Sequence, residues 1–169
     1  LMAFTKTSDI TTTTWDATSV SSRAVTLPSM NAGDFIYFFI HTNDQNGVPT
    51  VTVSDTVNGS YTAKQSDTSG SNNFVQHFYF KNSGAGTNVV ITATFTGAQQ
   101  QFIAIYASAW GGADTTTGFD VEDQQRQINP GTTTDAITSV ATTAPNTAQA
   151  DLILGVCYED GNETGHVVA

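Results

Sequence analysis

Residues 48–64 read VPTVTVSDTVNGSYTAK, and this stretch decides the expected fold. Every second residue is apolar in 51–54 and again in 61–64, a pattern typical of strands with one buried and one solvated face. Between the two runs, Asn58-Gly59 supplies residues that accept the positive φ angles of a tight primed turn. The stretch therefore predicts a β-hairpin.

The same pattern recurs along the whole chain. Turn-forming pairs such as Asn46-Gly47 and Gly111-Gly112 separate short runs rich in β-branched and aromatic residues, and no helical period intervenes. Strands are expected near residues 12–20, 23–27, 34–42, 48–54, 60–65, 74–81, 88–96, 101–109, 137–142 and 151–158. This spacing predicts an all-β fold, an antiparallel two-sheet sandwich of immunoglobulin-like or jelly-roll type, in a single domain spanning 1–169.

The run at 74–81 shows the expected pleat most clearly. One side of this strand would carry mainly phenylalanine, and the other a mixture of residues with a histidine. The first side comprises Phe74, Gln76, Phe78 and Phe80, and the second Val75, His77, Tyr79 and Lys81. We expect the phenylalanine side to face the core.

Composition narrows the classes of partner. The chain has 169 residues, of which 38% are hydrophobic, so it can build a sizeable core. Its formal charge of −10 comes with no basic run, which argues against nucleic acid and anionic membrane as partners. The apolar run at 35–40 is too short to cross a bilayer. Low charge with abundant Thr, Ser, Asn and Gly favours an extracellular, cell-surface or virion location.

No sequence signature of catalysis is present. The chain lacks a nucleophile elbow, a phosphate-binding loop and a zinc-protease motif, so we expect it not to be an enzyme. Cys157 is the single cysteine and lies in an apolar run, which favours a buried thiol over a nucleophile. His41, His77 and His166 are isolated from one another in sequence, and we expect structural roles for them.

Two acidic segments offer oxygen ligands of the kind that calcium prefers. Asp44 and Asn46 follow one apolar strand, and Glu159, Asp160 and Asn162 follow another. In an immunoglobulin-like sandwich, loops that leave two central strands of the same direction lie at the same end, so the two segments could share one ion. The alternative is that these residues simply form turns, since neither segment has the spacing of an EF-hand.

Aromatic side chains are candidates for a sugar platform, because a flat ring stacks on the apolar face of a pyranose. Trp110 ends a predicted strand, and Tyr61 lies in the expected hairpin; Trp15, Tyr79 and Tyr106 are further candidates. The alternative for Trp110 is a place in the core beneath the segment that follows it.

Five segments together resemble a known family. They are Val51-Thr52-Val53-Ser54-Asp55, Asn58-Gly59-Ser60-Tyr61-Thr62, Phe78-Tyr79-Phe80-Lys81-Asn82, Gly86-Thr87-Asn88-Val89-Val90-Ile91-Thr92 and Trp110-Gly111-Gly112-Ala113-Asp114-Thr115-Thr116. The pattern is similar to a recurrent immunoglobulin-like β-sandwich module of bacterial secreted and surface proteins and phage virion proteins. The resemblance covers about Val48 to Ala169 and implies a display or adhesion module without catalytic residues. Ala109 departs from it, because an acidic residue often precedes the aromatic there.

The last residues read as the start of another strand. Similar modules continue beyond this point, so we expect the domain to lack its C-terminal strands or to continue in a longer protein. His166, Val167 and Val168 would then form an open sheet edge to which another chain can add a strand. The sequence thus predicts a non-catalytic structural or adhesive subunit or repeat of an extracellular assembly, a phage virion or surface filament. Its partners would be copies of itself or neighbouring structural proteins; the alternative is a carbohydrate-binding module of a secreted enzyme that recognises surface glycans.

Overall fold

The computed structural model describes residues 4–14, 17–43, 47–69 and 73–116, together with the single positions Leu152 and Leu154. The chain divides into two units, Met2–Gly118 and a second made of Leu1 with Phe119–Ala169. All described strands belong to the first unit. Within the described ranges we find no helix of the length and apolar character needed to cross a membrane.

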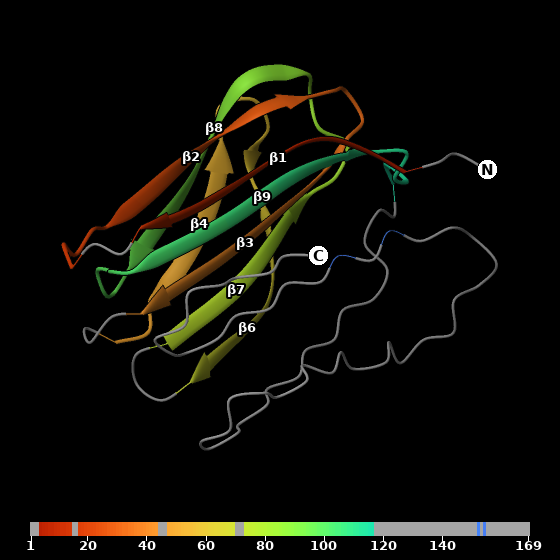
Figure 1. Cartoon of the computed structure of the whole chain (residues 1–169). Helices are drawn as coiled ribbons and strands as arrows, with labels where there is room; N and C mark the ends of the chain where they lie inside the picture. Colours follow the sequence, from red (N-terminus) through yellow and green to blue (C-terminus); the bar gives the residue numbers. More distant parts are fainter. Residues whose placement is uncertain are drawn as a thin grey trace, which may run out of the picture. The chain divides into compact units, whose positions relative to one another are not determined.

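The strands form two antiparallel sheets that pack face to face (Figure 1). One sheet has five strands in the order β1-β9-β3-β7-β6, and the other has four in the order β2-β8-β4-β5. Their bounds are β1 Thr5–Thr14, β2 Ser22–Met30, β3 Phe35–Asn43, β4 Thr50–Asp55, β5 Gly59–Ser60, β6 Thr62–Ser69, β7 Asn73–Phe80, β8 Gly86–Thr96 and β9 Ile103–Gly111. The predicted all-β sandwich is confirmed.

The pairing of strands distinguishes between the two expected types of sandwich. The first described strand lies beside the last, β2 beside β8, β3 beside β7 and β4 beside β5. Most connections cross from one sheet to the other, as happens when one long hairpin of chain is rolled into two layers. This strand order is that of a jelly roll.

Alternation along the strands builds the core between the sheets. On β3, Ile36, Phe38 and Ile40 are fully buried, and the rings of Phe38 and Phe78 meet edge to face with centroids 6.1 Å apart. The other sheet contributes alternate residues of β8, including Ile91. The expectation for 74–81 is confirmed, since the core includes Phe74 and Phe78 with Phe80 packed against it, while His77 and Tyr79 lie on the opposite face.

The predicted hairpin is present but shorter than expected, and its turn differs. β5 pairs with β4 over only two residues, and Asp55 lies opposite Gly59, so the loop between them has three residues. Gly59 has a φ of 83°, whereas Asn58 is absent from the non-glycine residues of positive φ in the described ranges, so this is not a two-residue primed turn. From Thr62 onward the chain pairs with β7 in the other sheet.

The first predicted strand is misplaced. β1 runs from Thr5 to Thr14, earlier than the expected 12–20, and residues 17–19 are not in a strand. The threonine run at 11–14 has no apolar alternation to fix a boundary, and pairing with β9 decides it instead. The expected strands at 137–142 and 151–158 lie outside the described residues, apart from two single positions.

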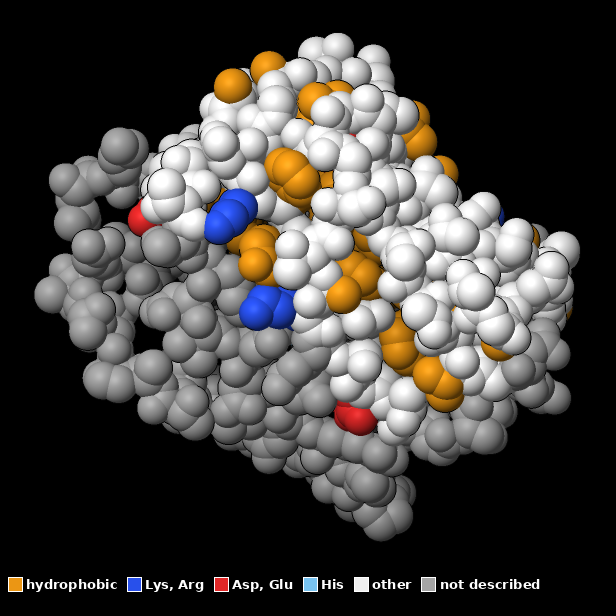
Figure 2. Space-filling model, turned by 180° about the vertical axis from the view of Figure 1, so that it is seen from behind, with side chains coloured by type: hydrophobic (Ala, Val, Ile, Leu, Met, Phe, Trp, Pro, Cys, Tyr) orange, Lys and Arg blue, Asp and Glu red, His pale blue; other side chains and the backbone are white. Residues whose placement is uncertain are grey.

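The outer face of the four-stranded sheet is mostly polar and uncharged, with Val90 as an exposed apolar residue. Exposed hydroxyl side chains follow its strands in register, for example Thr52 opposite Thr94 and Thr50 opposite Thr96. Figure 2 views the molecule from behind and shows few charged side chains on this side. A wet face of this kind needs no partner to be stable, since its hydroxyl groups bond water.

Candidate functional site

The outer face of the five-stranded sheet is aromatic. Side chains of β3, β7 and β9 that point away from the core place six large rings there, which we call the aromatic face: Phe35, Tyr37, Phe39, Tyr79, Tyr106 and Trp110. The strand register puts Phe35 opposite Trp110 and Phe39 opposite Tyr106. Antiparallel pairing thus gathers residues that are up to 75 positions apart in the sequence.

The rings of this face support one another. Phe35 stacks on Tyr79 with centroids 5.7 Å apart, and Tyr37 lies 6.4 Å from Tyr106. Phe35 and Tyr37 are only 5% and 7% exposed, whereas Phe39, Tyr79, Tyr106 and Trp110 remain partly exposed. Phe35 and Tyr37 are therefore the buried members of the aromatic face, and solvent reaches the other four rings.

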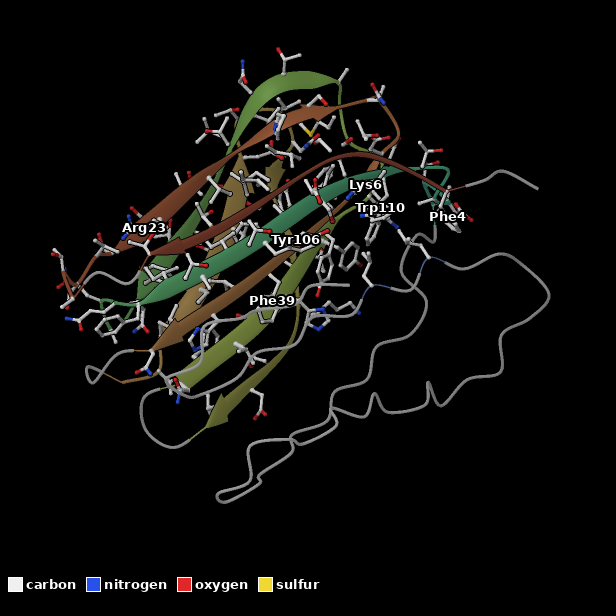
Figure 3. All side chains as sticks on the ribbon, in the orientation of Figure 1. Phe4, Lys6, Arg23, Phe39, Tyr106 and Trp110 are labelled. Atoms are coloured by element: carbon white, nitrogen blue, oxygen red, sulfur yellow. The ribbon has the colours of Figure 1, made fainter. Side chains whose placement is uncertain are left out.

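Trp110 is held in a defined orientation near the end of β9. Its indole Nε1 donates a hydrogen bond to Ser108 Oγ at 2.9 Å, and Ser108 is fully buried. The indole has no other polar atom, so the rest of the ring is free to make apolar contacts. Figure 3 shows Trp110, Tyr106 and Phe39 on the same side of the sheet, with Lys6 beside Trp110.

An ion pair on the edge strand β1 borders these rings. Lys6 lies opposite Trp110 and Asp9 opposite Ser108, and Lys6 Nζ contacts Asp9 Oδ2 at 2.9 Å. The hydrogen bond to Asp9 and its negative charge raise the pKa of Lys6, which stays protonated at neutral pH. Both side chains are close to half exposed, so the pair contributes little to stability and its groups stay accessible.

The two predicted sugar-platform residues have different environments. Trp110 is partly exposed on the aromatic face, as the platform hypothesis requires. Tyr61 is only 7% exposed, belongs to the hydrophobic core and packs against Phe80 with centroids 5.7 Å apart. The assignment of Tyr61 to a platform is therefore corrected, because the chain switches sheets at this residue and carries its ring inward.

The proposed calcium ligands lie outside the described residues. This applies to Asp44, Asn46, Glu159, Asp160 and Asn162, and the expected assembly edge at His166, Val167 and Val168 lies outside them as well. Within the described ranges, no group of three or more His, Cys, Asp or Glu side chains could hold a metal ion.

The two described histidines have structural surroundings. His41 is 1% exposed, and its Nε2 lies 3.5 Å from Asn73 Oδ1. His77 meets the Tyr37 ring edge-on with centroids 6.0 Å apart. Both residues pack among neighbours on one sheet face.

Each described aspartate side chain interacts with residues close to it in the sequence. Asp9 pairs with Lys6, whereas the carboxylates of Asp34, Asp55, Asp67 and Asp114 accept hydrogen bonds from backbone N–H groups within three residues. Such bonds fix turns and strand ends.

Three of the six rings, Tyr79, Tyr106 and Trp110, were candidates from the sequence, whereas the three rings of β3 had been read only as part of an apolar run. Tyr106 and Trp110 fall on one face of a predicted strand, and their spacing of four was a readable signal. The position of Lys6 and Asp9 beside them was not, because the strand at 12–20 was predicted in the wrong place. Comparisons with protein-family models, with curated proteins and with solved structures find no match for this chain.

Proposed function

We propose that this chain is a non-catalytic structural or adhesive β-sandwich module, a subunit or repeat of an extracellular assembly such as a virion or a surface filament. The observation that carries the proposal is the edge strand β1. This strand of ten residues pairs with β9 on one side, and the described residues provide no second strand on the other. An edge of this length is a template for strand addition by a neighbouring chain.

Two further observations support a non-catalytic module. The described aspartates accept hydrogen bonds from nearby backbone N–H groups or form an ion pair. The jelly-roll order is also used by viral capsid subunits and by lectins, an analogy of fold that raises both assembly and sugar binding as functions.

The test is the oligomeric state of the purified chain, measured by light scattering. We expect concentration-dependent association that Thr13→Lys weakens, because Thr13 is exposed on β1 and a charge on an edge strand opposes pairing. Thr94→Lys is the matched control, since Thr94 is also exposed but lies on β8, which is paired on both sides. A monomer at all concentrations would contradict the proposal.

A carbohydrate-binding module is the second candidate. It is favoured by the partly exposed rings of Trp110, Tyr106, Phe39 and Tyr79 on one sheet face. On this account the sandwich is a recognition domain of a secreted protein, and retention on a polysaccharide is its test.

A further inference from the structure

The rings of Tyr106 and Trp110 form a two-ring surface on one strand. They are four residues apart on β9, and the buried Ser108 lies between them. At a rise of ~3.4 Å per residue, their Cα atoms are separated by roughly 14 Å. Two partly exposed rings on one strand suit an extended chain of sugar rings better than one small molecule.

Both rings are fixed before any ligand arrives. The hydrogen bond from Trp110 Nε1 to Ser108 Oγ ties the indole to its own strand. Tyr106 leans on Tyr37, whose ring is 7% exposed and cannot move aside easily. A ligand that stacks on rings held in this way avoids much of the entropic cost of ordering them.

Polar groups border the rings on the β1 side. Lys6 offers donors and Asp9 offers acceptors, with 46% and 43% of their side chains exposed. The Tyr106 hydroxyl has no hydrogen-bond partner within the described residues and can both donate and accept. Sugar hydroxyl groups also donate and accept, so a border of both kinds is complementary to them.

The charge of the protein indicates which class of polysaccharide the site would bind. The chain carries a formal charge of −10, and the site itself contains one positive and one negative group that neutralise each other. A polyanionic glycan would be repelled by the protein as a whole without a local excess of positive charge to attract it. We propose that Trp110, Tyr106 and the Lys6–Asp9 pair form a binding site for a neutral polysaccharide, an inference that rests on the second candidate function.

The test is affinity electrophoresis in gels that contain a soluble neutral glycan, with mixed-linkage β-glucan, xyloglucan, galactomannan and glycogen as probes and alginate as the polyanionic comparison. We expect retention by at least one neutral glycan and none by alginate. Trp110→Ala should weaken binding at least ~10-fold, whereas Trp110→Phe should retain part of it. Thr94→Ala, on the outer face of the other sheet, should leave binding unchanged.

The outcomes separate this inference from the assembly proposal. Thermal unfolding of each variant reports whether the fold is intact, and Tyr106→Ala provides a second ring deletion if Trp110→Ala unfolds the protein. Unchanged retention of a folded ring-deletion variant, or no retention of the wild type by any neutral glycan, would overturn the site. An oligomer that binds no glycan overturns this inference alone, whereas a glycan-binding monomer supports it and overturns assembly.

Discussion

At the scale of single residues, the carboxylate of Asp55 accepts four hydrogen bonds. It accepts hydrogen bonds from the backbone N–H groups of Val57 and Asn58, from Asn58 Nδ2 and from the Tyr61 hydroxyl, at 2.5 to 2.7 Å. Asn58 in turn accepts a bond from the Gly84 N–H at 2.7 Å. The Asp55 side chain thus fixes the β4–β5 turn and, through Tyr61, the point where the chain changes sheets. Through Asn58 it is also linked to the loop at Gly84.

Asp55→Asn should lower the free energy of unfolding by roughly 1–3 kcal/mol, because the substitution removes the charge and replaces an acceptor oxygen by a donor. Urea unfolding measures the change. Asp9→Asn is the control, since the exposed Lys6–Asp9 pair is expected to change stability by less than about 1 kcal/mol. Equal losses in the two variants would contradict the special role of Asp55.

Tyr61 makes stability depend on pH in the alkaline range. Burial above all, and next the hydrogen bond and charge of Asp55, raise the pKa of Tyr61 far above its ordinary value of 10.0. The folded state therefore keeps this proton while the unfolded chain releases it, so stability is fully present below pH 10 and falls as the pH rises above that value.

We expect Tyr61→Phe to cost about 1 kcal/mol at pH 7 through the lost hydrogen bond. Above pH 10 the free energy of unfolding of the variant should fall with pH less steeply than that of the wild type. The difference corresponds to the one proton that Tyr61 releases when the wild type unfolds. Chemical denaturation at several pH values tests this, and parallel slopes for the two proteins would refute it.

At the scale of secondary structure, β3 shows how one strand serves both the core and the candidate site. Phe38 is fully buried between the sheets, whereas the next residue, Phe39, is partly exposed on the aromatic face. Phe38→Ala should cost about 3–5 kcal/mol because it opens a cavity in the core. Phe39→Ala should cost less than half as much, as guanidinium unfolding of both variants would show. Similar losses would mean that the two faces of β3 are equally enclosed.

At the scale of the whole molecule, charge should govern association. Copies that each carry a formal charge of −10 repel one another at low ionic strength. If assembly uses the polar edge of β1, raising the salt concentration from about 10 mM to about 500 mM should strengthen it, because the Debye length shrinks to a few ångströms. Light scattering at fixed protein concentration measures this. Association that weakens with salt would instead indicate an interface of paired opposite charges.

The sequence alone determined the class of fold and most of its strands. Alternation of apolar and polar residues has the period of the pleat, so the buried faces of 74–81 and 88–96 follow from it directly. Residues 35–40 are apolar throughout, so the sequence predicted a strand there without showing which face is in the core. Glycine and asparagine also predicted the positions of turns, because they accept the backbone angles that turns require. The rings of Tyr106 and Trp110 could also be assigned to one strand face.

Tertiary structure alone decided which strands pair and what meets at the site. Register depends on contacts between distant segments, so neither the jelly-roll order nor the place of Lys6 beside Trp110 could be read from local pattern. Gln100 is the clearest case: it follows a loop, yet it is fully buried and receives a hydrogen bond from Thr42 Oγ1 at 2.6 Å. Tyr61 likewise looked like one more strand residue, and only the crossing of the chain to the second sheet turned its ring into the core.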